Sequence, residues 1–280
     1  MNETITVKQN PIEKFFKGEK SVWKLLIIIN IAIHLLGLLS EFIYQTNYLF
    51  VYGAKINFFI ADKQIYRLVT SMFLHADFFH LLANCYAIYA LGEAVEAIFG
   101  TKKFLAIYFI AGITGSMASF ILSPHNALGA SGGIFGFFGV HLYLYLRKPD
   151  VYKKIFGKSI FFLLLLNLYI GFSNPQIDNY AHIGGLIGGF LACFTVGLKQ
   201  ENIMKVKNLA FAFLVFAIIS IGTIFGINYR DSSPDYYYQK VIISFQLEQY
   251  DTGVEALQEG LNQHPEDADL LELYTLIYQQ

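Results

Sequence analysis

One stretch decides the fold: Gly129-Ala130-Ser131-Gly132-Gly133-Ile134-Phe135-Gly136-Phe137-Phe138-Gly139, which places one hydroxyl among five glycines in an otherwise apolar segment. Each glycine inside a helix costs roughly 1 kcal/mol relative to alanine. So many glycines therefore indicate that another backbone must approach this segment closely. Gly-x-Ser-x-Gly is also the nucleophile-elbow pattern of soluble hydrolases, where it follows a strand of an α/β sheet. The rest of the chain decides between these two contexts.

Composition excludes a soluble domain. The chain has 280 residues, of which 55% are hydrophobic and only 15% are charged. A soluble domain has about a quarter charged residues. The charges are also segregated, which leaves uncharged runs of about 20 residues, the length that crosses a bilayer as a helix. We predict an all-α polytopic membrane protein with spans at 22–43, 77–98, 104–123, 129–147, 159–175, 179–198 and 208–228.

Lysine and arginine predict the orientation of these spans. One face of the membrane receives the N-terminal tail and every second connection, and it carries 15 of the 20 basic residues. The other face receives only Lys55, Lys63, Arg67, Arg230 and Lys240. The positive-inside rule then places the N-terminus in the cytoplasm and the C-terminus outside. We expect a multi-pass protein of a bacterial cytoplasmic membrane, with no nucleic-acid partner because the net charge is only −1.

Isolated polar groups within spans have simple interpretations. Cys85 and Cys193 are expected to be small buried apolar residues rather than a disulfide or a redox pair. His34 stands alone among Ile and Leu, and a neutral imidazole bonded to a neighbouring helix explains it better than a functional role.

The second span opens with His75-Ala-Asp-Phe-Phe-His80-Leu-Leu-Ala-Asn84. His80 and Asn84 are four residues apart and therefore share a helical face. Two polar groups in hydrocarbon need partners. They either hold helices together or donate hydrogen bonds to a reacting oxygen. Metal binding is disfavoured because the His-Glu-x-x-His spacing is absent, and we expect neither a metal nor a cofactor.

The sixth span opens with Asn179-Tyr-Ala-His182-Ile-Gly184-Gly185-Leu-Ile-Gly188-Gly189. Glycines four residues apart let two helices approach backbone to backbone, as the glycines around Ser131 also require. If the fourth and sixth spans pack together, Ser131 and His182 become neighbours. The second, fourth and sixth spans all enter from outside, so the polar residues at their heads lie about 3–10 Å below the outer surface.

These groups suit acyl transfer. A serine hydroxyl needs a base to take its proton, and a neutral histidine is the usual base. The oxyanion then needs donors, for which Asn84, His80 and the Ser131 backbone N–H are available. Asp178 is more consistent with a helix N-terminus than with a third catalytic member. A Ser131–His182 dyad is the simplest interpretation, with Phe135 placed to stack on the histidine ring.

The chain resembles the rhomboid family of intramembrane serine proteases over residues 60–198. The resemblance rests on His75, His80 and Asn84, on Gly129, Ser131, Gly132 and Gly136, and on Ala181, His182 and Gly185. It implies a six-helix catalytic bundle in which Ser131 is the nucleophile, His182 the general base, and His80 and Asn84 stabilise the oxyanion. Tyr66-Arg67 resembles the Trp-Arg pair common in the family's first loop. The seventh span gives a six-plus-one arrangement.

The division that follows is a cytoplasmic tail (1–21), a protease domain (22–198), a linker with the seventh span (199–228) and an extracytoplasmic tail (229–280). The extracytoplasmic tail is predicted to form three helices. The apolar face of the first contains Tyr237, Val241 and Phe245, that of the second contains Val254, Ala256, Leu257 and Leu261, and that of the third contains Leu270, Leu271, Tyr274 and Ile277. It loosely resembles a tetratricopeptide unit, although Gly253 and Gly260 replace the usual alanines. It either binds a protein partner or forms a solvated cap.

The expected substrates are single-span membrane proteins cut near their extracytoplasmic end. The family resemblance implies that they enter beside the fifth span, where Phe161, Phe162, Leu163 and Leu164 close the bundle against lipid. A catalytically inactive rhomboid-like protein that binds membrane clients is the alternative, but it should lack Ser131 or His182. A transporter would instead place its polar groups at the bilayer midplane.

Overall fold

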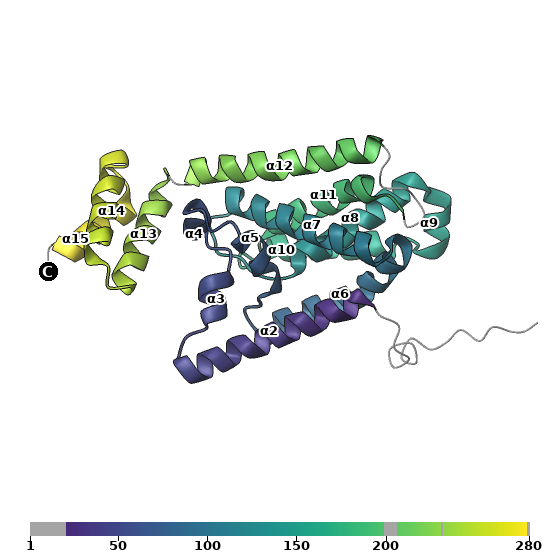
Figure 1. The fold of residues 1–280 in the computed structure, drawn as a ribbon, viewed down its shortest axis with the longest axis horizontal. Coiled ribbons are helices and arrows are strands. Elements are labelled where there is room, and N and C mark those ends of the chain that lie inside the picture. The colour runs from purple at the N-terminus through teal and green to yellow at the C-terminus, as the bar shows by residue number, and fades with distance from the viewer. Residues whose placement is uncertain (1–20, 199–205, 231, 279–280) are drawn as a thin grey trace, which may run out of the picture.

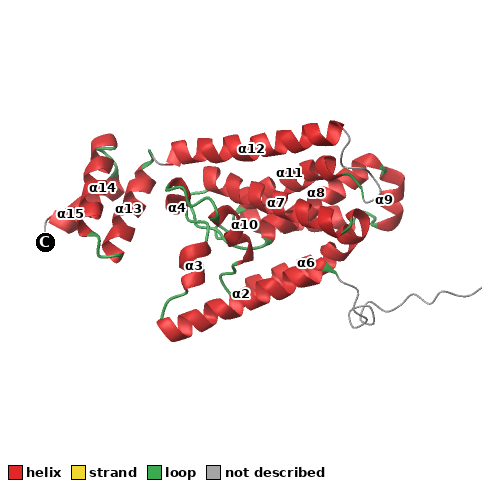
Figure 2. Cartoon of the chain, in the orientation of Figure 1, coloured by secondary structure: helices red, strands yellow, loops and turns green. Residues whose placement is uncertain are grey.

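The computed structural model describes residues 21–198, 206–230 and 232–278, and every regular element in these ranges is a helix (Figures 1 and 2). The first helices are α2 (Val22–Tyr44), α3 (Tyr48–Gly53), α4 (Asn57–Ala61), α5 (Arg67–Thr70) and the 3-10 turn η1 (Ser71–Phe73). The bundle continues with α6 (Phe78–Phe99), α7 (Thr101–Leu122), α8 (Ser131–Arg147), α9 (Pro149–Ile155), α10 (Ser159–Ser173), α11 (Asn179–Val196) and α12 (Val206–Arg230). The tail contains α13 (Pro234–Gln246), α14 (Tyr250–Gln263) and α15 (Ala268–Tyr278). The all-α fold expected from the composition is confirmed.

Three helices form the centre of the bundle. α7, α8 and α11 pack against one another, α6 covers α8 and carries α2 on its other side, and α12 lies along α7 and α11. α10 makes few contacts, chiefly with α8 and α11 (Figure 1). The buried core draws on Phe104, Tyr108, Phe137 and Val140 from the central helices. Large apolar residues cover the outward faces of α2, α10 and α12, as expected where helices face lipid.

Helices occur at all seven predicted span positions, but not all are long enough to cross a membrane alone. By length and composition, five qualify: α2, α6, α7, α11 and residues Lys207–Arg230 of α12. The pair α9 and α10, bent by 82°, is a sixth candidate. α8 has only 17 residues, most of them buried. A helix enclosed by other helices need not match the bilayer thickness that lipid-facing helices must match.

The outer loop between α2 and α6 folds around Arg67. This residue is buried, and its guanidinium donates to the carbonyl oxygens of Val51 and Ala54 and to the Gln64 side chain at 2.9–3.0 Å. The guanidinium also lies 4.2 Å from the ring centre of Phe59. Tyr66 is exposed, and its hydroxyl donates to the Gln64 side chain at 2.9 Å. Arg67 therefore anchors the loop.

The C-terminal tail has its own small core and lies at the α12 end opposite α9 (Figure 1). The three predicted helices are present, and Tyr237, Val241, Ala256 and Leu257 are buried as predicted. The face predicted for the third helix is partly wrong. Leu271 and Tyr274 are exposed, and Leu273 is buried beside Leu270 instead.

The two glycines that weaken the tetratricopeptide resemblance have packing reasons. A Cβ on Gly253 would lie 2.5 Å from the Phe245 ring, and one on Gly260 would lie 2.7 Å from the Tyr237 Cβ. Alanine would be too large at either position because aromatic side chains of α13 occupy the space. The tetratricopeptide assignment itself stays a prediction.

Candidate active site

Ser131 is the first residue of α8 and follows a segment that is fixed from outside the bundle. The Gly129 N–H donates to the Ser71 carbonyl at 2.9 Å. Ala127 and Lys55 exchange both of their backbone hydrogen bonds at 3.0 Å, an isolated antiparallel bridge. The outer loop therefore determines where α8 begins and holds Ser131 half-buried at its head.

Gly129 brings His80 and Asn84 beside this segment. Its φ is +128°, which side-chain-bearing residues rarely adopt. A Cβ built there would lie 2.8 Å from His80 Nε2 and 3.6 Å from Asn84 Nδ2. The backbone conformation and the lack of space both require glycine at this position. The side chains of His80 and Asn84 therefore lie beside Gly129, which precedes Ser131 by two residues.

Two glycine stripes on α11 seat it against two different helices. A Cβ on Gly185 would lie 2.1 Å from the Gly132 carbonyl oxygen, and one on Gly189 would lie 2.3 Å from the Gly136 Cα. α8 and α11 are therefore in backbone contact, as the sequence predicted. The second stripe, Gly184 and Gly188, faces α7 instead.

The contact with α7 centres on Thr114. Its hydroxyl donates to the Gly184 carbonyl at 3.1 Å, and a Cβ on Gly188 would lie 1.8 Å from that hydroxyl oxygen. A Cβ on Gly115 of α7 would lie 2.6 Å from the Ala181 carbonyl. This second interface was not predicted, although the small residues of 112–119 are the signal that indicates it.

His182 stacks on Phe135, one turn below Ser131. Their ring centres are 4.0 Å apart and the planes differ by 9°, so the predicted stacking is present. His182 Nδ1 is buried and finds no hydrogen-bond partner in the part of the chain that the structure describes. Asp178 does not serve as that partner. Its carboxylate caps α11 by accepting from the Ala181 N–H at 3.1 Å, and it also accepts from the Ser119 hydroxyl.

Two further observations concern the polar groups of α6. Asn84 is 6% exposed, and its Nδ2 donor has no partner among the described residues. His75 is also buried and lies edge-on to the His80 ring with centres 5.2 Å apart, and neither of its ring nitrogens has a side-chain hydrogen-bond partner within the described ranges. His75 was noted in the sequence without a role, and the structure places it behind His80. In the described ranges no group of three or more His, Cys, Asp or Glu residues has the arrangement of a metal site.

Comparison with known proteins identifies the family of this chain. The model of the rhomboid domain family matches residues 62–199. Rhomboid protease GluP of Bacillus subtilis (strain 168) is 35% identical over 259 residues, which are 92% of this chain and 51% of that protein. Putative rhomboid protease YdcA of the same organism is 37% identical over 148 residues, covering 52% of this chain and 74% of that protein. The chain belongs to the rhomboid family.

More distant relatives also match this rhomboid chain. RHOMBOID-like protein 1 of Arabidopsis thaliana is 33% identical over 145 residues, covering 51% of this chain and 37% of that protein. This rhomboid spans about half the length of GluP. The family match covers the segment that contains His75, His80, Asn84, Ser131 and His182.

The predicted substrate entry needs correction in one respect. Phe161 packs against Tyr145 and Tyr152, with ring centres 5.3 and 5.7 Å away. Tyr145 lies 14 residues along α8 from Ser131, roughly 20 Å at the helical rise. The named residues 161–164 therefore lie at the wrong end of this rhomboid's α10 to gate the serine. The opposite end, at Tyr169 and Phe172, is exposed and closer to the α11 start.

The two cysteines of the rhomboid are buried and free, as expected from their positions within spans. The Cys193 thiol contacts the Gly189 carbonyl at 3.2 Å, within the helix–helix core.

Proposed function

We propose that this chain is an intramembrane serine endopeptidase that cuts the transmembrane segments of single-span membrane proteins. The observation that carries the proposal is the backbone contact of α8 with α11, because it puts Ser131 and His182 at the head of one interface. The names of GluP and YdcA support the same activity. Both residues that an inactive relative would lack are present.

The mechanism uses a dyad. His182 takes the Ser131 proton, for which Nε2 is the nitrogen available, while the serine oxygen attacks the scissile carbonyl. A tetrahedral intermediate forms, and its collapse expels the amine, which takes the proton from His182. Water then hydrolyses the acyl-enzyme by the same route in reverse. Phe135 orients the imidazole by stacking in place of a carboxylate.

Asn84 and His80 stabilise the oxyanion in this proposal. A buried amide donor without a protein partner is costly to keep, and Asn84 Nδ2 is such a donor. A developing oxyanion beside Gly129 would accept its hydrogen bond. The Ser131 backbone N–H provides a further donor. This favours transition-state binding over a purely structural role for Asn84.

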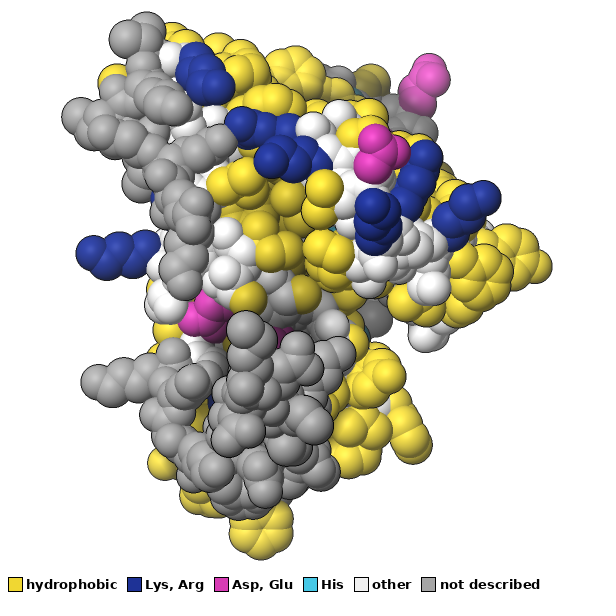
Figure 3. Space-filling view, turned by 90° about the vertical axis from the view of Figure 1, so that its right-hand side faces the viewer, with side chains coloured by type: hydrophobic (Ala, Val, Ile, Leu, Met, Phe, Trp, Pro, Cys, Tyr) yellow, Lys and Arg dark blue, Asp and Glu magenta, His cyan; other side chains and the backbone are white. Residues whose placement is uncertain are grey.

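Cleavage is expected near the extracytoplasmic end of the substrate span. The basic residues of the bundle gather at the end that carries α9, which Figure 3 views directly. The positive-inside rule assigns that end to the cytoplasm and the Ser131 end to the outside. A peptide carbonyl within a helix is already bonded, so helix-breaking residues at the outer end of the substrate should favour cleavage.

The test uses the purified full chain in detergent with a fluorophosphonate probe and a model single-span substrate. We expect labelling at Ser131, loss of labelling and cleavage in Ser131→Ala, and loss of cleavage in His182→Ala, with melting temperatures retained. Mass spectrometry of the products should locate the cut in the outer half of the span. Labelling that persists in Ser131→Ala would contradict the nucleophile, and a cut in the inner half would contradict the orientation.

A further inference from the structure

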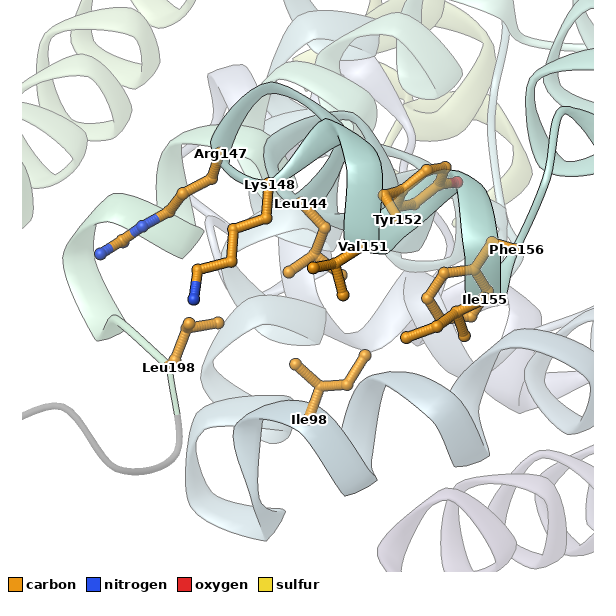
Figure 4. A pocket seen from close by; sticks show the side chains of 9 residues that line it. All are labelled: Ile98, Leu144, Arg147, Lys148, Val151, Tyr152, Ile155, Phe156 and Leu198. Carbon is orange, nitrogen blue, oxygen red and sulfur yellow. The ribbon is translucent and has the colours of Figure 1, made fainter.

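A second site lies at the opposite end of the molecule from Ser131. A pocket of about 180 Å³ opens between the end of α6, the corner where α8 meets α9, and Leu198 after α11 (Figure 4). Its wall is apolar apart from two cations, and consists of Ile98, Leu144, Val151, Tyr152, Ile155, Phe156 and Leu198. An apolar cavity of about 150 Å³ binds a benzene-sized molecule. This pocket therefore accommodates a short stretch of hydrocarbon.

Both cations of the pocket lie where α8 meets α9. Arg147 is the last residue of α8 and Lys148 follows it; both are exposed, and in Figure 4 Lys148 points towards Leu198 whereas Arg147 points away from the apolar lining. The Arg147 guanidinium donates to the Tyr143 hydroxyl, which holds it at this position. The surrounding surface is basic (Figure 3). The segments that border the pocket carry Lys102 and Lys103 at the start of α7 and Lys153, Lys154 and Lys158 after Lys148, with Glu93, Glu96 and Asp150 as the acidic residues of the same segments.

Helix α9, which lines one side of the pocket, has the character of an interfacial helix. α9 makes an angle of 82° with α10 and so runs across the bundle direction. Val151 and Ile155 are 51% and 66% exposed, while Tyr152 is buried. A short helix with exposed apolar residues beside Lys153 and Lys154 suits the boundary between headgroups and acyl chains. The pocket then opens at headgroup level.

We propose that this pocket binds one anionic phospholipid of the leaflet on the α9 side. Part of an acyl chain lies between Ile98 and Val151, and the phosphate lies at Lys148 and Arg147. The acyl chain leaves one apolar environment for another, so the hydrophobic effect discriminates little. Selection rests on the headgroup charge, as in basic pockets between membrane helices. The site is independent of the proteolytic activity.

The experiment reconstitutes the full chain in phosphatidylcholine nanodiscs with a trace of phospholipid carrying a diazirine in one acyl chain. The probe has either a phosphatidylglycerol or a phosphatidylcholine headgroup. We expect the anionic probe to label peptides that contain Ile98, Val151 or Ile155, and the zwitterionic probe to label them about fivefold less. Lys148→Gln should reduce anionic labelling by about the same factor, and Val151→Phe should abolish it by filling the pocket.

Lys154→Gln is the matched control, because it removes one exposed charge from the next helix, α9, outside the pocket. It should keep the wild-type labelling. Equal losses in Lys148→Gln and Lys154→Gln would indicate general surface attraction and overturn the site. Equal labelling by both probes would overturn it as well. So would displacement of the anionic probe by millimolar glycerol phosphate, which would identify a soluble phosphate as the occupant.

Discussion

At the scale of single residues, replacing Asn84 distinguishes a structural role of its side chain from a catalytic one. Its Nδ2 has no partner among the described residues, so removing the amide group costs no hydrogen bond donated by this nitrogen. Asn84→Ala should therefore leave the melting temperature nearly unchanged. If the amide binds the oxyanion, kcat should fall by about ten- to a thousandfold with KM little changed. A drop in melting temperature with proportional loss of kcat and substrate binding would instead show that Asn84 holds α6 in place.

Gly129 permits a second residue-scale prediction because Gly157 provides its control. Both have positive φ, +128° and +64°. A Cβ on Gly129 would meet His80, whereas one on Gly157 would meet nothing within 4 Å. Both alanine variants should lose about 1–2 kcal/mol of stability from backbone strain. Only Gly129→Ala should also lose turnover, by up to about a hundredfold, because His80 is displaced. Equal turnover in the two variants would show that the position of His80 does not affect catalysis.

Sequence patterns pointed to polar residues with local signatures at the heads of their helices, and missed contacts that have no local signature. Ser131, His182, Asn84 and His80 follow from spacing along helices that enter from one side. Lys55 shows the limit. It appears in the sequence as one basic residue of an outer loop, but it is fully buried and donates to the His125 carbonyl at 2.7 Å. That contact joins positions 70 residues apart, which no periodic pattern specifies.

At the scale of elements, the glycine spacing predicted the close contact of α11 with α8 but did not indicate its second close contact, with α7. Two glycine stripes one residue apart lie on adjoining faces of a helix, and each could serve the same partner or two different ones. The structure assigns Gly185 and Gly189 to α8, and Gly184 and Gly188 to α7. Which stripe contacts α7 depends on where the small residues of α7 lie on its surface. That position is known only once the rotation of α7 about its own axis is known.

This assignment predicts a difference in rescue. A Cβ on Gly188 meets the Thr114 hydroxyl at 1.8 Å, whereas one on Gly189 meets only the backbone of Gly136. Gly188→Ala and Gly189→Ala should each destabilise the bundle by about 1–3 kcal/mol through overpacking. Adding Thr114→Ala should restore part of the loss in Gly188→Ala and none in Gly189→Ala. Thermal melts of the single and double variants in detergent measure the coupling, and strictly additive losses at Gly188 would contradict the contact.

At the scale of the whole molecule, the segment before Ser131 connects three regions distant in sequence. The outer loop holds it through Lys55, and through Asn57, which donates to the Ser123 carbonyl at 2.8 Å. The end of α12 holds it through Arg230, which donates to the same carbonyl at 2.8 Å. The tail reaches the loop through Tyr236, whose ring centre lies 5.2 Å from that of Phe58. Tail, loop and α8 therefore form one connected outer surface.

Lys55 makes this surface sensitive to pH. Burial lowers the pKa of its ammonium group to about 7 from an ordinary value of 10.5, with Arg230 lowering it further and Asp178 and Asp235 opposing the shift. The unfolded chain therefore binds more protons than the folded chain between these two values. The contribution of this group to stability rises with pH across that window, by up to about 1.4 kcal/mol per pH unit. Below pH 7 both states are protonated and the cost of burying the charge is fully present.

The variant Lys55→Met tests this effect, because it keeps an unbranched side chain only one atom shorter and removes the charge; the hydrogen bond to the His125 carbonyl that it also removes is present at every pH. Against wild type, the variant should be most stable below pH 7 and should lose that advantage steadily as pH rises towards 10. Lys63→Met, which changes an exposed lysine of the same loop, should give a melting curve parallel to wild type at every pH. The measurement is the melting temperature of each protein in detergent at half-unit steps. If the melting temperature of Lys55→Met also ran parallel to that of wild type at every pH, the pKa of Lys55 would not fall on folding. A partner that stabilises the buried ammonium group would then offset the cost of its burial.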